Sequence, residues 1–125
     1  DGEATYDAIL ARMVLPFVPD LKATLEELRR VLRPGGRLLA SVPGALSPIY
    51  RDSWLRHLPG GDPGNSYLLP WELAALLTRL GWTILEGWGE WGADLYATEN
   101  AVVSAGTSPI VVQQATATTW AILAE

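Results

Sequence analysis

Residues 6–43 constrain the fold more than any other part of the chain. They contain two apolar runs separated by a loop, a segment with helical periodicity and a Gly-rich turn: YDAILARMVLPFVPDLKATLEELRRVLRPGGRLLASVP. Two such runs joined by a helix predict two parallel strands in a right-handed βαβ unit, because parallel strands need a long crossover connection. We therefore expect an α/β fold whose first strand, residues 6–11, is buried on both faces.

The helix between these strands has recognisable start and stop signals. Asp20 is placed to accept hydrogen bonds from the free N–H groups of the first helical turn. Apolar residues then recur at the spacing of one helix face: Leu21, Leu25, Leu28, Val31 and Leu32. Pro34 cannot continue a helix and the glycines after it favour a left-handed turn, so the second strand is predicted over residues 37–42.

Further elements are predicted downstream. Residues 70–80 form a second helix with Pro70 at its first position, where no backbone donor is needed. Strands are predicted at residues 82–86, 109–113 and 118–125, of which the second is apolar and β-branched. The glycines of residues 87–92 are interpreted as a strand end, a bulge or a turn.

A long loop, residues 44–69, follows the second strand and is rich in proline and glycine. Ligands of open α/β sheets bind beyond the carboxyl ends of the strands, and loops of this length are often lids. The loop has an unusual set of aromatic and polar residues, namely Tyr50, Arg51, Trp54, Arg56, His57 and Tyr67. We expect a substrate-lid insertion, with His57, the only histidine, either as a candidate base or as a surface residue.

Composition narrows the function classes. The 125 residues suffice for one domain, and 49% hydrophobic against 18% charged residues indicates a globular chain. A net charge of −5 argues against nucleic-acid binding, and no apolar run could span a membrane. The absence of cysteine excludes disulfides and is compatible with the cytoplasmic location that we expect.

The βαβ unit resembles the second half of class I methyltransferases, the Rossmann-like enzymes that use S-adenosylmethionine. The matching segments are Asp1-Gly2, residues 6–10, Val14-Leu15, residues 18–20, residues 25–32 and residues 33–39, with a later match at residues 71–85. The resemblance covers a little over half of the chain. It implies a partial Rossmann-like three-layer sandwich that contains the family's strands four to seven, with the last strand antiparallel.

The resemblance also implies a cofactor and site residues. S-adenosylmethionine would lie against the loop after the first strand, at Ala11, Arg12, Met13 and Phe17. Some related enzymes carry Glu and His in this loop, but Pro16 and Phe17 stand here and neither binds a metal or a proton. We therefore expect no metal, and methyl transfer driven mainly by proximity and orientation. The small-molecule acceptor would contact Tyr50, Arg51, Trp54 and Tyr67.

Half of the family's cofactor site is not identified in this sequence. No Gly-rich turn between a strand and a helix is recognised, although the family holds the cofactor mainly on such a turn. The chain begins near the family's fourth strand, so residues 1–125 are expected to be one partial domain. We expect a missing N-terminal segment or a partner chain to complete the sheet, because an exposed sheet edge is an aggregation hazard.

Two alternatives remain open. The chain could be a non-catalytic Rossmann-like binding or scaffold module that acts with a partner chain. A nucleotide-dependent oxidoreductase of Rossmann type is the weaker alternative, because it fits the run from Val31 to Gly36 less well.

Overall fold

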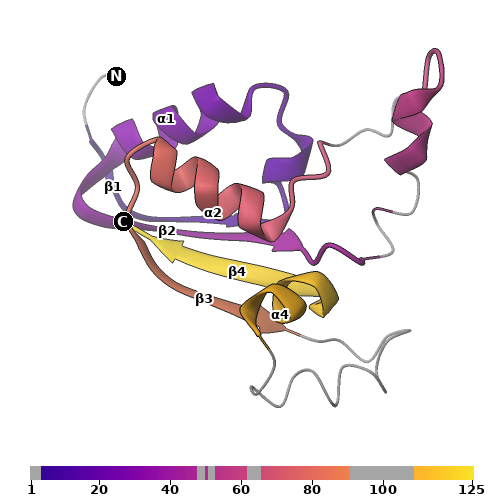
Figure 1. Ribbon diagram of the computed structural model, residues 1–125. Coiled ribbons are helices and arrows are strands. Elements are labelled where there is room, and N and C mark those ends of the chain that lie inside the picture. The colour runs from indigo at the N-terminus through magenta and orange to yellow at the C-terminus, as the bar shows by residue number, and fades with distance from the viewer. Residues whose placement is uncertain (1–3, 48–49, 51–52, 62–65, 91–108) are drawn as a thin grey trace.

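The structure is a computed structural model that describes residues 4–47, 50, 53–61, 66–90 and 109–125 (Figure 1). Its elements follow one another in the order β1 (Tyr6–Arg12), η1 (Leu15–Phe17), α1 (Leu21–Val31), β2 (Leu32–Pro43), η3 (Ser53–His57), α2 (Pro70–Arg79), β3 (Ile84–Glu90), α4 (Ile110–Thr116) and β4 (Thr119–Ala124). None of the helices in these ranges is long and apolar enough to cross a membrane.

The four strands form one mixed sheet in the order β1-β2-β4-β3. β1 and β2 are parallel, which confirms the predicted βαβ unit, and Leu10 lies opposite Leu39 in their register. β4 runs antiparallel to both β2 and β3, between which it is inserted. The sequence prediction of a last antiparallel strand in a partial Rossmann-like sheet is confirmed.

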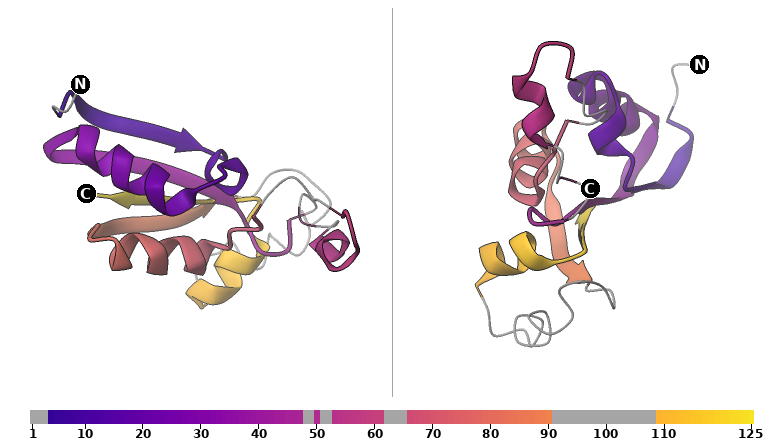
Figure 2. Two further views of the ribbon diagram at one scale, coloured as in Figure 1. Left: turned by 90° about the horizontal axis from the view of Figure 1, so that it is seen from above. Right: turned by 90° about the vertical axis from the view of Figure 1, so that its right-hand side faces the viewer.

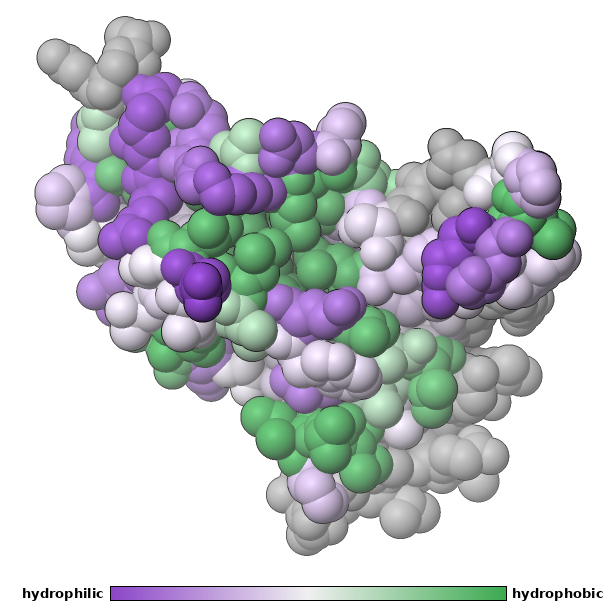
Figure 3. All heavy atoms as spheres, turned by 45° about the horizontal axis from the view of Figure 1, so that its top comes forward, coloured by the Kyte–Doolittle hydropathy of each residue, from purple (hydrophilic) through white to green (hydrophobic). Residues whose placement is uncertain are grey.

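α1 and α2 cover one face of the sheet (Figures 1 and 2). The side chains between these two layers make the core, and its buried residues include Leu25, Leu38, Leu73, Leu77, Trp120 and Ile122. Charged residues cover the outer surface of the helices, whereas apolar residues gather between them (Figure 3). The helix periodicity in the sequence therefore identified the buried face correctly.

No helix of the described ranges covers the other face of the sheet (Figures 1 and 2). Side chains of alternate strand residues point to this face, and several are large and apolar. Leu10 is 67% exposed and Tyr6 is 55% exposed, and Leu85 in β3 is 42% exposed. The prediction that the first strand is buried on both faces is therefore wrong, because the described part of the chain supplies only two of the three layers of a Rossmann-like sandwich.

The predicted helix boundaries are confirmed by their caps. An Asp20 carboxylate oxygen accepts a hydrogen bond from the Ala23 N–H at 3.0 Å. α2 begins at Pro70, and the Glu72 carboxylate accepts from the Leu69 N–H at 2.9 Å. Gly35 has a φ of 79°, the expected left-handed conformation, but it lies inside β2, which begins at Leu32 and not at the predicted residue 37.

The strand predicted over residues 109–113 is wrong. These residues begin α4, which starts directly after Pro109 and exposes Ile110, Val111 and Val112 as an apolar patch (Figure 3). Two carbonyl groups at the end of α4, those of Gln114 and Ala115, accept hydrogen bonds from the backbone that follows β2. These tertiary hydrogen bonds stabilise a short helix that β-branched residues alone would not favour.

Candidate functional site

The site begins where β1 and β2 end side by side. Arg12 is the last residue of β1 and lies opposite Ser41 of β2. The next residue, Met13, has a φ of 57°, which is uncommon for a residue other than glycine. Its N–H donates to the Ser41 carbonyl at 3.0 Å and to the Ser41 hydroxyl at 3.2 Å. Ser41 therefore fixes a strained turn at the carboxyl end of the sheet, where such strain is typical of binding sites.

The four predicted cofactor residues occupy different environments around this turn. Ala11 is 5% exposed and belongs to the core, whereas Met13 is half-buried. Arg12 is exposed, and its guanidinium forms no hydrogen bond or ion pair within the described ranges. Phe17, at the end of η1, is 51% exposed. The turn thus presents the exposed guanidinium of Arg12 and the exposed ring of Phe17 to a ligand.

A shallow cavity of about 250 Å³ lies beside Arg12 on the open face of the sheet. Its lining includes Ser41, Trp88 and Glu90 in addition to Arg12 and Leu10. The sequence reasoning assigned no role to Ser41 and Glu90. Ser41 is visible in the sequence as the one polar residue near the end of an apolar strand. Glu90 lies among glycines whose spacing is compatible with a strand end, a bulge or a turn.

The glycine spacing of residues 87–92 matches the G-x-G-x-x-G pattern of dinucleotide-binding turns. In the structure Gly87 and Gly89 lie inside β3, not in a turn between a strand and a helix. A Cβ at Gly87 would lie 3.2 Å from the Trp120 ring. Gly87 therefore makes room for a core indole.

The loop of residues 44–69, the predicted lid, is joined to this site through a backbone hydrogen bond. The Ser66 N–H donates to the Pro16 carbonyl at 2.7 Å. Tyr67, the next residue, has a φ of 53°. The segment that returns from the lid to α2 is therefore held against the loop that follows β1.

Two of the predicted acceptor residues form an aromatic pair at the base of the lid. The Tyr50 and Tyr67 rings are 5.2 Å apart and 64° inclined, and the Arg56 guanidinium lies 5.7 Å from the centre of the Tyr67 ring. Tyr50 is 8% exposed, and its hydroxyl donates to the Leu68 carbonyl at 2.9 Å. Burial, with a smaller contribution from the Glu72 charge, raises the pKa of Tyr50 well above its usual range.

The other predicted lid residues lie apart from this pair. Trp54 is 56% exposed and His57 is also exposed, both on η3. η3 projects beyond the carboxyl ends of the strands, away from the tip of β1 (Figures 1 and 2). Arg51 lies outside the described residues. The structure thus pairs Tyr50 with Tyr67 and joins η3 to this pair through Arg56, whereas Trp54 and His57 of the same η3 are exposed.

No group of three or more His, Cys, Asp or Glu side chains within the described ranges could hold a metal ion.

The chain is similar to proteins of one family. A family model described as "Methyltransferase domain" matches residues 1–86. No curated protein sequence matches the chain. Similar solved structures include an S-adenosylmethionine-dependent methyltransferase from Mesorhizobium loti, with 14% identity and a TM-score of 0.58, covering 98% of this chain and 63% of that one.

Two further structures have the same fold. An S-adenosylmethionine-dependent methyltransferase from Thermotoga maritima has 16% identity and a TM-score of 0.62, covering 98% of this chain and 56% of that one. A chain in the complex of the Haloferax volcanii Trm112 methyltransferase activator with a methyltransferase has 18% identity and a TM-score of 0.62. The match covers 98% of this chain and 54% of that one. The chain therefore spans roughly half to two thirds of their length. It belongs to the methyltransferase domain family.

Proposed function

We propose that the protein transfers a methyl group from S-adenosylmethionine to a small-molecule acceptor. The observation that carries this proposal is the strained Met13 turn, which Ser41 fixes at the carboxyl end of β1. Ligands of open α/β sheets bind at this edge, and a turn held by two hydrogen bonds presents its neighbours in a fixed geometry.

The side chains around the turn fit one wall of the cofactor site. Arg12 offers an exposed guanidinium that suits a carboxylate, and Phe17 offers an exposed ring that suits a flat base. S-adenosylmethionine would supply an electrophilic methyl group on a sulfonium. The role of Met13, Arg12 and Phe17 would be to position that cofactor and exclude water from it.

The loop of residues 44–69 is proposed to hold the acceptor. Trp54 and His57 are exposed on η3 and free to approach a ligand, whereas Tyr50 and Tyr67 fix the base of the loop. Methyl transfer is an in-line displacement, so holding the acceptor atom in line supplies much of the rate. A base is needed only for an acceptor that arrives protonated, and His57 is our candidate for that proton.

The second wall of the site is proposed to come from chain outside these 125 residues or from a second polypeptide. The support for this proposal is the open sheet face, with Leu10 and Tyr6 more than half exposed, and the outer edge of β1, which pairs with no other described strand. The same observation favours a second candidate function, a non-catalytic module that acts by binding a partner chain through this face.

These two candidates can be distinguished by nuclear magnetic resonance on the full-length protein. Titration with S-adenosylhomocysteine should shift the amide signals of residues 11–15 and Phe17 and leave those of Thr83 and Ile84, at the other end of the sheet, unchanged. Arg12→Gln should weaken binding by about tenfold, because one charge-assisted hydrogen bond is lost. Arg56→Gln, which removes a lid cation, is the matched control. A well-folded protein that shows no shifts would favour the non-catalytic module.

A further inference from the structure

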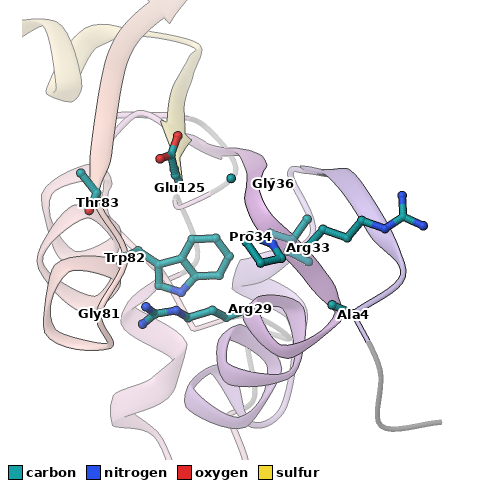
Figure 4. A pocket seen from close by; sticks show the side chains of 11 residues that line it. Ala4, Arg29, Arg33, Pro34, Gly36, Gly81, Trp82, Thr83 and Glu125 are labelled. Atoms are coloured by element: carbon teal, nitrogen blue, oxygen red, sulfur yellow. The ribbon is translucent and has the colours of Figure 1, made fainter.

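A second cavity lies at the amino-terminal end of the sheet, opposite the candidate active site. Its volume is about 450 Å³, within the range of small-ligand sites. The first residues of β2, the loop that follows α2 and the residue after β4 line it (Figure 4). The lining residues that matter here are Arg29, Arg33, Pro34, Trp82 and Glu125.

The Trp82 indole is the first unusual feature of this cavity. The side chain is 3% exposed, and its Nε1 is buried with no hydrogen-bond partner within the described ranges. An indole N–H can only donate a hydrogen bond. Burying a donor without an acceptor is costly, so most buried donors in proteins are satisfied. A group that accepts from this N–H would therefore be stabilised here.

Arg29 is the second unusual feature. Its Nη1 donates to the Leu80 carbonyl at 2.9 Å, and within the described ranges it forms no ion pair. A Cβ at Gly81 would lie 2.0 Å from Nη1, so glycine at this position leaves the room that the guanidinium occupies. The indole nitrogen lies on the edge of the Trp82 ring that faces Arg29 (Figure 4). The Arg29 guanidinium and the Trp82 indole N–H, both hydrogen-bond donors, thus lie close to each other at the edge of the cavity.

The other charges of the cavity are already paired. Arg33 forms an ion pair with Asp7 at 3.1 Å, and Glu125 lies 3.7 Å from Arg37. Within the described residues, Arg29 therefore supplies a positive charge that no carboxylate compensates. A neutral acceptor would satisfy the indole, but an anion would also satisfy the charge.

We propose that this cavity binds a small organic anion, whose oxyanion group lies between the Arg29 guanidinium and the Trp82 indole N–H. The Pro34 ring and the apolar face of Trp82 provide a wall for the rest of the ligand. Because the cavity is at the opposite end of the strands from Met13, the bound anion takes no part in methyl transfer. The site is a stabilising or regulatory one, independent of the proposed function.

The test is a titration of the full-length protein followed through its indole ¹⁵N–H signals. These 125 residues contain six tryptophans, and Trp82→Phe identifies the signal of Trp82. One arm adds sodium phosphate and the other sodium benzoate, both at constant ionic strength. We expect the Trp82 signal alone to shift and to saturate at millimolar anion. If benzoate saturates the shift at a lower concentration than phosphate, the ligand is a carboxylate. If phosphate saturates it at a lower concentration than benzoate, the ligand is a phosphate.

Arg29→Gln should weaken this binding by about tenfold, because one charged donor is lost. Arg79→Gln removes an exposed arginine of α2 outside the cavity and should change nothing. Neither variant should alter binding of S-adenosylhomocysteine, which separates this site from the proposed active site.

If Trp82→Phe does not fold, the comparison of Arg29→Gln with the wild-type protein still tests the proposal, because the indole signal that shifts in the wild-type protein should need about tenfold more anion to shift in the variant. The proposal is overturned if all indole signals shift together, or if the Trp82 signal does not move in either arm.

Discussion

Both oxygen atoms of Ser41 accept a hydrogen bond from the Met13 N–H. The carbonyl oxygen lies 3.0 Å and the hydroxyl oxygen 3.2 Å from the Met13 nitrogen. This contact joins residues that are 28 positions apart in sequence, at the point where two parallel strands end. It holds Met13 in the left-handed conformation and so sets the position of Arg12 and Phe17 on either side. The proposed cofactor wall depends on this contact.

Ser41→Ala should therefore weaken S-adenosylhomocysteine binding several-fold while it lowers the free energy of unfolding by only about 1 kcal/mol. The carbonyl acceptor remains, so the turn loosens but does not disappear. Calorimetric titration and urea unfolding of the same preparation measure both effects. Thr78→Val is the matched control, because it removes a hydroxyl that donates to Ala74 on α2. A similar loss of binding in both variants would contradict the assigned role of Ser41.

Gly44→Ala should destabilise the protein by about 1–3 kcal/mol, as overpacked sites do. The added Cβ would lie 1.9 Å from the Ala117 carbonyl oxygen, in the linker between α4 and β4. The backbone there has little freedom, because the residues after Gly44 donate hydrogen bonds to α4. The urea midpoint measures the effect.

Gly60→Ala is the control for this substitution. Gly60 has a φ of 73° but nothing lies within 4 Å of its Cβ position, so the cost is conformational and about 1 kcal/mol. Equal destabilisation by the two substitutions would show that the close approach at Gly44 does not constrain the fold.

Much of the fold could be predicted from sequence because local signals agreed with one another. Asp20, the leucine spacing of α1 and the Gly35 turn all predict the same βαβ unit, and the structure confirms it. The helix α4 could not be predicted in this way. Ile110, Val111 and Val112 favour a strand by propensity, and the hydrogen bonds that stabilise the helix come from residues more than sixty positions earlier.

The site could be predicted less well than the fold. Strand polarity was enough to place Arg12 and Met13 at a ligand-binding edge. The role of Ser41 depends on the register between β1 and β2, and the burial of Tyr50 depends on how the lid folds back to Leu68. Neither the register nor the fold of the lid follows from local sequence.

Stability should fall as the pH rises above about 10, the usual pKa of tyrosine, because Tyr50 resists ionisation in the folded protein. Its folded pKa is raised, mainly by burial, so its contribution is complete below the unfolded pKa. Above that value the unfolded chain releases the proton more readily, and the contribution declines. Thermal unfolding between neutral and alkaline pH measures the slope.

Tyr50→Phe should lose about 1 kcal/mol at neutral pH with the hydrogen bond to Leu68, and should show a shallower decline at alkaline pH. Tyr6→Phe is the control, since Tyr6 is 55% exposed and should leave the slope unchanged. The same slope in all three proteins would contradict the role of burial at Tyr50.

Trp54→Ala tests the proposed role of the lid. Because Trp54 is 56% exposed, the substitution should change stability by no more than about 0.5 kcal/mol. It should raise the acceptor KM and leave the affinity for S-adenosylhomocysteine unchanged. Trp71→Ala, on the surface of α2, provides the comparison. Equal losses of acceptor and cofactor binding in Trp54→Ala would rule out a lid that contacts only the acceptor.

The central claim is that the carboxyl end of β1 forms part of a cofactor site. Calorimetric titration of S-adenosylhomocysteine into the purified full-length protein tests it most directly. The account predicts micromolar binding with one site per protein, weakened by Arg12→Gln and unaffected by Arg29→Gln. A folded protein that releases no heat of binding would contradict the claim, and would leave this Rossmann-like sheet as a scaffold for a partner chain.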